Sequence, residues 1–156
     1  MQGNKDVIAS LNQALHSELT AVHQYMLDAE MCENWGYGRL ASLIQKQAVD
    51  EMKHAERLME RILFLDGSPE MGGQFAIPPA SDVRALFQRQ LQLELDAVRE
   101  YNAAVKTAAG AGDQGSKELF DELLRDEEQH VDFLETQLEL IRQTGLENYL
   151  AQQIRS

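Results

Sequence analysis

Hydrophobic residues recur along most of the chain at alternating spacings of three and four, the period of an amphipathic α-helix. Between residues 4 and 35 the apolar positions include Leu11, Leu15, Val22, Tyr25 and Ala29. Between residues 80 and 109 the same pattern is formed by Phe87, Leu91, Val98, Tyr101 and Val105. Both stripes are long enough to predict helices rather than strands.

All ten glycines and three prolines fall in five short places, which separate the helical patterns. Because glycine and proline are the residues least compatible with a helix interior, each place predicts a helix boundary. The intervening sequence is rich in strong helix formers. The expected helices span about 4–35, 39–66, 81–109, 116–144 and 146–154.

The lengths of the breaks predict how these helices connect. Short breaks around residues 36–38 and 110–115 reverse the chain between antiparallel neighbours. A helix over 39–66 is about 42 Å long, and the break from 67 to 80 extends about 46 to 50 Å, enough to cross the bundle. We therefore expect an all-α fold: one domain over 1–156, a four-helix bundle with one long crossover and a short fifth helix.

Each predicted apolar stripe also contains ionisable residues, and their spacing is duplicated. Glu18, Glu51 and His54 recur at an offset of 76 residues. The second set is Glu94, Glu127 and His130. Each half thus has a core glutamate followed by a Glu-x-x-His motif, which indicates an ancient duplication of a helical hairpin.

These six side chains should lie at similar heights along the bundle and meet in its core. Four ionised carboxylates there would each cost several kcal/mol without compensation, and two divalent cations would cancel their charge. One imidazole per metal with several carboxylates suits iron or manganese better than calcium or structural zinc. A lone Glu-x-x-His is usually a surface pair, and a metal-free helical scaffold is the structural alternative; the matched duplication favours the metal site.

The sequence resembles bacterioferritin over nearly its whole length. The resemblance is carried by Glu18, Glu94, D-E-M-K-H at 50–54, D-E-E-Q-H at 126–130 and G-L-E-N-Y-L at 145–150. It implies a ferritin-like di-iron fold with a ferroxidase centre that oxidises iron(II) with dioxygen or peroxide. The family stores the ferric mineral inside a shell of 24 subunits built from dimers. In the implied site one iron is bound by Glu18 and His54, the other by Glu94 and His130, with Glu51 and Glu127 bridging. The family also implies a ferredoxin-type electron donor for iron release.

Met52 follows Glu51 directly, so its side chain should point away from the metal site toward an apolar outer face of the helix. In bacterioferritins a methionine here from each of two subunits ligates haem b. The resemblance therefore implies haem b at Met52, although a methionine on such a face is often only packed. Haem-free bacterial ferritin is the main alternative.

Several other positions bear on electron transfer, on an inner-surface iron site and on iron entry. Tyr25 is expected beside Glu18, where it either packs in the core or donates an electron. Lys46 stands where the family often has histidine, which puts an inner-surface iron site in doubt although Asp50 remains; Phe133 replaces a frequent tryptophan. Acidic residues that resemble iron entry positions are Asp66, Asp132 and Glu139.

The net charge and the cysteine content exclude further classes of protein and partner. The net charge of −12 disfavours binding to nucleic acid or anionic membranes, which also makes a DNA-protecting mini-ferritin a poor reading. One cysteine, Cys32, excludes the four-cysteine module of rubrerythrin-type peroxidases. No apolar run is long enough to span a bilayer. We expect a cytoplasmic protein.

The short segment 146–154 resumes an amphipathic pattern after Gly145. A nine-residue helix is unstable alone and must dock against something. In the family it packs around a four-fold axis of the shell; the alternative is that it caps its own bundle.

Overall fold

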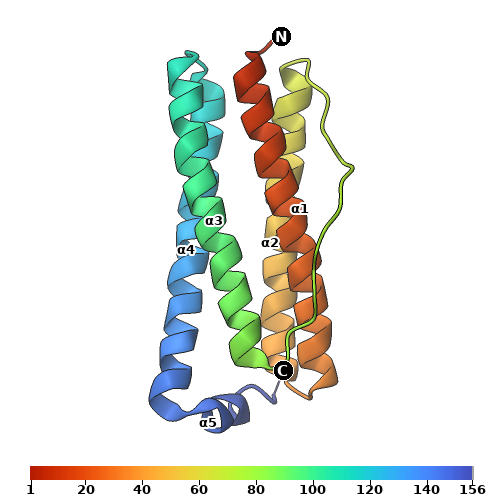
Figure 1. The fold of residues 1–156 in the computed structure, drawn as a ribbon, viewed down its shortest axis with the longest axis vertical. Helices are drawn as coiled ribbons and strands as arrows, with labels where there is room; N and C mark the ends of the chain where they lie inside the picture. Colours follow the sequence, from red (N-terminus) through yellow and green to blue (C-terminus); the bar gives the residue numbers. More distant parts are fainter. Residues whose placement is uncertain (156) are drawn as a thin grey trace.

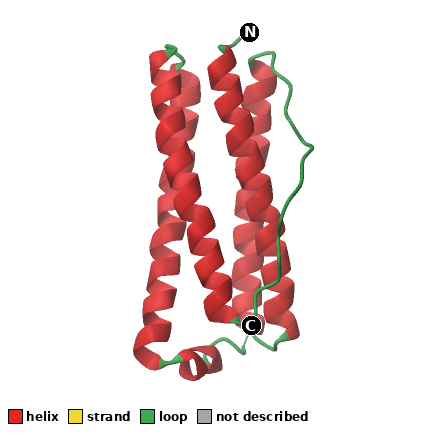
Figure 2. Ribbon diagram, viewed as in Figure 1, coloured by secondary structure: helices red, strands yellow, loops and turns green. Residues whose placement is uncertain are grey.

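The computed structural model describes residues 1–155 and consists of five α-helices. They are α1 (Lys5–Asn34), α2 (Gly38–Phe64), α3 (Val83–Gly110), α4 (Gln114–Thr144) and α5 (Leu146–Ala151). The first four form a bundle, and α5 lies across one end of it (Figures 1 and 2). The predicted all-α ferritin-like bundle is confirmed. None of the helices in residues 1–155 combines the length and apolar character that crossing a membrane requires.

Polar side chains mark where three of the long helices begin. Asn4 accepts hydrogen bonds from the backbone N–H groups of Asp6 and Val7. Asp82 and Asp113 accept in the same way at the starts of α3 and α4. These caps satisfy N–H groups that have no partner within the helix.

The connection from residue 65 to 82 runs the length of the bundle alongside α1 (Figure 1). Consequently α2 and α3 run in the same direction, while each pairs with an antiparallel neighbour in a hairpin, α1 with α2 and α3 with α4. Phe75, near the middle of the connection, stacks between His16 and His23 of α1, with ring centroids 5.1 and 4.3 Å apart. This crossover is the one that the break lengths predict.

The fifth helix is shorter than expected, because it ends at Ala151 rather than at residue 154. Beyond it, the N–H of Gln153 bonds the carbonyl of Leu150, three residues back, which is a turn and not an α-helix. The carbonyl of Gln153 then accepts from the N–H of Arg39, at the start of α2. Tyr149 is buried edge-on against Phe87. Within one chain, α5 therefore caps its own bundle.

The apolar core is divided into two clusters along the bundle. The first, here the proximal cluster, includes Leu11, Leu58, Ile62, Tyr101 and Phe120. The second, the distal cluster, includes Tyr25, Ile44, Phe87, Leu134 and Tyr149. On every long helix, the ionisable residues predicted as metal ligands lie between the two clusters.

Candidate metal centre

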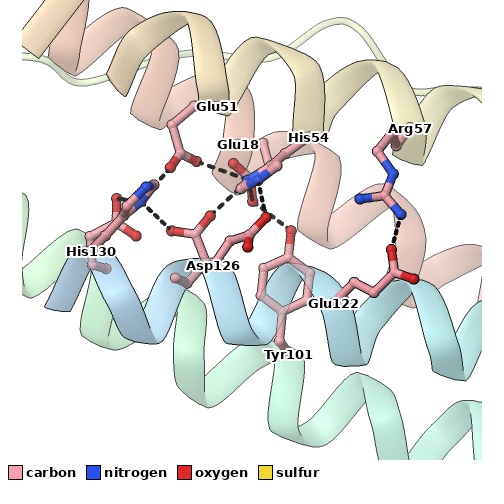
Figure 3. A network of polar contacts seen from close by, with 10 residues as sticks. Glu18, Glu51, His54, Arg57, Tyr101, Glu122, Asp126 and His130 are labelled. Atoms are coloured by element: carbon pink, nitrogen blue, oxygen red, sulfur yellow. Dashed lines mark hydrogen bonds and ion pairs between the residues drawn. The ribbon is translucent and has the colours of Figure 1, made fainter. Parts of the chain in front are cut away.

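All six predicted ligands meet in the layer between the two clusters, each long helix contributing at least one. Figure 3 shows Glu18, Glu51, His54 and His130 pointing toward one another in this layer. They form two overlapping groups in which the candidate ligand atoms lie within 4.8 Å of one another. The first group is Glu18, Glu51, His54 and Glu127; the second is Glu51, Glu94, Glu127 and His130. Glu51 and Glu127, the shared glutamates, belong to both groups.

The histidines face the carboxylates through their Nδ1 atoms. Nδ1 of His54 lies 2.9 Å from Oε1 of Glu127 and 3.5 Å from Oε1 of Glu18. Nδ1 of His130 lies 2.8 Å from Oε1 of Glu51 and 3.3 Å from Oε2 of Glu127. Each histidine therefore contacts a shared glutamate from the opposite hairpin, so neither hairpin can build a site alone.

Three carboxylate oxygens in this layer lack a hydrogen-bond partner, and two of them also lack an ion-pair contact. Oε2 of Glu18 and Oε2 of Glu94 are both fully enclosed and unpaired, and the two residues are 2% and 1% exposed. An unsatisfied buried acceptor costs about 1–3 kcal/mol, and more when it is charged. A bound cation would satisfy both, and the set of carboxylates with one imidazole per position suits iron or manganese.

Without a cation the layer retains protons. Burial raises the pKa of Glu51, and the charge of Glu18 raises it further. Burial also raises the pKa of Glu127, reinforced by neighbouring carboxylates. Burial lowers the pKa values of His54 and His130, but their carboxylate partners outweigh it and leave both raised. A metal ion entering the layer must displace these protons.

Two tyrosines cross the bundle to reach the layer. The hydroxyl of Tyr25 on α1 donates to Oε1 of Glu94 on α3, and that of Tyr101 on α3 donates to Oε1 of Glu18 on α1 at 2.6 Å. The structure pairs the hydroxyl of Tyr25 with Glu94 and not with Glu18, the residue beside which Tyr25 was expected. Burial raises the pKa of both phenols. Sequence reasoning overlooked Tyr101 as a site residue, although the 76-residue offset that relates it to Tyr25 is visible.

A second overlooked residue is Asp126, which precedes the shared glutamate of α4. Its Oδ2 lies 3.0 Å from Nε2 of His54, the nitrogen that faces away from the other carboxylates. Such a contact fixes the orientation and tautomer of a ligating histidine. Asp126 also lines an open hollow of about 380 Å³ with Asp50, Lys53, His54, Arg57, Gln129 and His130. The hollow gives both histidines access to the surface between α2 and α4.

The other predicted residues lie outside this layer. Met52 is 45% exposed on α2, near the equally exposed Val49, and Met26 is exposed on α1. Lys46 is exposed one turn before Asp50.

The three predicted entry-pore acids, Asp66, Asp132 and Glu139, are exposed and do not converge within one chain. Asp66 follows α2 at one end of the bundle, whereas Glu139 lies near the other end and is hydrogen-bonded by Arg142. Any pore that they line would require several copies of the chain, so this role stays a prediction.

Comparison with known proteins agrees with this architecture. A ferritin-like domain model matches residues 8–144. The chain is 42% identical over 149 residues to the bacterioferritin of Brucella melitensis, covering 96% of this chain and 92% of that protein. It is 40% identical over 152 residues to that of Mycolicibacterium paratuberculosis, covering 97% and 96%. The chain belongs to the bacterioferritin family.

A third bacterioferritin, from Streptomyces coelicolor, is 39% identical over 151 residues, which cover 97% of this chain and 90% of that protein. The match to the bacterioferritins therefore extends past α4 and is not confined to the bundle. The resemblance to bacterioferritin seen in the sequence is confirmed.

Proposed function

We propose that this protein stores iron by oxidising iron(II) at a ferroxidase centre in each subunit. The observation that carries the proposal is the pair of overlapping ligand groups, each with three carboxylates and one imidazole, that share Glu51 and Glu127. Two cations held side by side with common bridging carboxylates are suited to passing two electrons to one oxidant. The reaction is the oxidation of four iron(II) ions by one dioxygen, with four protons consumed and two waters formed.

Each metal position has a glutamate and a histidine of its own. Glu18 and His54 hold one iron(II), Glu94 and His130 hold the other, and the shared glutamates bridge. Iron(II) is the substrate here, and it reaches the histidines through the hollow between α2 and α4. The protons that leave the layer on binding are available for the reduction of dioxygen. Tyr25, bonded to Glu94, serves as a one-electron donor.

The proposal is tested by adding iron(II) aerobically to the metal-free protein. A fast rise in ferric absorbance should saturate near two irons per subunit. The Glu18→Gln and His130→Ala variants should lose the fast phase, whereas Glu122→Gln, which changes an exposed carboxylate on α4, should keep it. Oxidation at the unaltered rate in both site variants would refute the centre.

Haem b, held between two subunits by Met52 from each, is the second part of the proposal. It is supported by the exposure of Met52 and Val49 on α2 and of Met26 on α1. Methionine sulfur is a suitable axial ligand for haem iron. The alternative is a haem-free ferritin in which the same face is only a subunit contact.

The wider assembly follows the family. Dimers build a hollow shell of 24 subunits that encloses ferric mineral, with acidic residues such as Asp66, Asp132 and Glu139 lining entry routes. A ferredoxin-type donor returns electrons when iron is released, and the protein acts in the cytoplasm. The acidic balance of the chain suits a partner that is a cation and not a nucleic acid.

A further inference from the structure

The two tyrosines of the metal layer occupy equivalent positions in the two halves of the chain. Tyr25 and Tyr101 are related by the same 76-residue offset as the ligands. Each donates its hydroxyl to the unshared glutamate of the other hairpin, the one that belongs to a single ligand group. Tyr25 donates to Glu94, and Tyr101 donates to Glu18. Each of the two unshared glutamates in the metal layer, Glu18 and Glu94, therefore accepts a hydrogen bond from a phenol.

Tyr101 is as well placed as Tyr25 for chemistry at this layer. It is 2% exposed and belongs to the proximal cluster, beside Phe120 at 6.1 Å between ring centroids. Tyr25, 1% exposed, belongs to the distal cluster. The tyrosines thus flank the layer from opposite sides, both shielded from water and from reductants in solution.

One-electron oxidation of a phenol at neutral pH requires that its proton leave at the same time. A carboxylate oxygen within hydrogen-bond reach is the acceptor that such a step needs. Oε1 of Glu18 lies 2.6 Å from the hydroxyl of Tyr101, and Glu18 is itself in the first ligand group. Only the carboxylate of Glu18 therefore lies between the Tyr101 hydroxyl and the first metal position.

We propose that Tyr101 is a second one-electron donor for dioxygen reduction, acting together with Tyr25. The inference rests on the proposed ferroxidase function, which supplies dioxygen as the oxidant. Tyr101 gives up one electron to dioxygen and its hydroxyl proton to Glu18, from which the proton passes to the reduced oxygen. The O–H bond of the phenol breaks, and a neutral tyrosyl radical remains.

The electron count gives this arrangement its significance. Two iron(II) ions supply two electrons and the two tyrosines supply two more, which together reduce one dioxygen to two waters. The two tyrosine protons and two further protons complete the waters, and the O–O bond is broken without release of hydrogen peroxide. Two later iron(II) ions and two protons then restore the phenols. The sum is the four-iron ferroxidase reaction, carried out at a centre that holds two irons.

The test combines radical detection with product analysis. Protein loaded without oxygen with two iron(II) per subunit is mixed with dioxygen, frozen within milliseconds and examined by electron paramagnetic resonance. Tyr25→Phe, Tyr101→Phe and the double variant are compared with Tyr149→Phe, a control that removes a buried hydroxyl bonded to Gln137 away from the layer. Incorporation of ring-deuterated tyrosine identifies a tyrosyl radical, because replacing the ring hydrogens by deuterium narrows the hyperfine splitting of that radical.

A tyrosyl radical should persist in Tyr25→Phe and vanish in the double variant. The double variant should release one hydrogen peroxide per dioxygen consumed, whereas the unaltered protein and Tyr149→Phe release little. Anaerobic cobalt(II) titration of Tyr101→Phe should still show two metals per subunit, so that loss of the radical is not loss of the site.

Two outcomes overturn the inference. If iron oxidation remains fast but every radical disappears in Tyr25→Phe, Tyr101 only positions Glu18 and the ferroxidase proposal survives. If the unaltered protein shows no fast iron oxidation at all, the ferroxidase proposal fails, and this inference fails with it.

Discussion

Asp126 holds the outward nitrogen of His54, with its Oδ2 3.0 Å from Nε2. The contact leaves Nδ1 of the same ring directed at the glutamates of the first metal position. Removing such an outer partner typically lowers metal affinity about 10- to 100-fold. Asp126→Ala should therefore weaken one of the two cobalt(II) sites by that factor in an anaerobic titration. Asp121→Ala, which removes another carboxylate from α4, should leave both affinities unchanged; equal weakening in the two variants would assign the effect to general surface charge.

The metal-free and metal-loaded proteins should respond to pH in opposite directions. The pKa values of Glu51 and Glu127 are raised, mainly by burial, and carboxylate partners raise those of the two histidines. Groups with raised pKa values stabilise the fold below their unfolded pKa and lose that contribution as pH rises. The metal-free protein should lose stability from about pH 4.5 upward.

Cations should reverse this slope, because they bind the deprotonated ligands. Saturating cobalt(II), at about 100 times its dissociation constant, should add about 2.7 kcal/mol per occupied site to the free energy of unfolding at neutral pH. Thermal unfolding followed by circular dichroism, with chelator or with cobalt(II), gives both curves. If stability depends on pH in the same way with chelator and with cobalt(II), the layer binds no metal.

A buried carboxylate outside the metal layer offers a separate stability test. Asp28 is completely enclosed and accepts hydrogen bonds from the side-chain amides of Gln24 and Gln90, at 2.8 and 2.7 Å. Burial raises its pKa to about 6 despite these bonds, so its charge opposes folding once pH exceeds its unfolded pKa near 3.8. Asp28→Asn should raise the free energy of unfolding at pH 7 by up to about 3 kcal/mol.

Rotation of the Gln90 side-chain amide would accommodate this substitution, because its Oε1 is buried without a partner and would then accept from the new asparagine. Urea unfolding of the metal-free protein at acidic and neutral pH measures the effect. The gain should vanish below about pH 4. A variant that is less stable than the unaltered protein at pH 7 would show that the ionised carboxylate is needed by the two amides.

Met52→Leu should remove haem while leaving iron oxidation intact. The side chain is exposed on the outer face of α2, whereas the neighbouring Glu51 is 1% exposed in the metal layer. Protein expressed with added haem precursor should show a Soret band that the variant lacks. Met59→Leu, another methionine of α2, serves as the control. An identical Soret band in Met52→Leu would leave haem-free ferritin as the better description.

Deletion of residues 146–156 should separate shell assembly from the folding of the bundle. Tyr149 fills part of the distal cluster, so the truncated chain should unfold at a lower temperature while remaining helical. If α5 also joins subunits, sedimentation should show small species in place of the shell. Tyr149→Phe, which keeps the ring and loses only its bond to Gln137, should assemble normally. An intact shell after the deletion would limit α5 to capping its own subunit.

The sequence was sufficient to predict the helices and the six residues of the metal layer. Helical periodicity and glycine breaks place the elements, and the duplicated spacing brings Glu18 and Glu94 to one height with the two Glu-x-x-His motifs. Contacts that cross between hairpins were harder to predict. The hydrogen bond from Tyr101 to Glu18 depends on the axial offset between the two hairpins. Packing of the core sets this offset. The early end of α5 depends similarly on the contact between Gln153 and Arg39.

The division of each metal position between the two hairpins has a consequence for biogenesis. The first position takes Glu127 from the later hairpin, and the second takes Glu51 from the earlier one. A nascent chain that has made only α1 and α2 therefore carries three of the four residues of the first group and one of the second. Complete coordination appears only when the two hairpins have docked. In the proposed ferroxidase, iron oxidation should therefore begin only in subunits whose two hairpins have already closed around the metal layer.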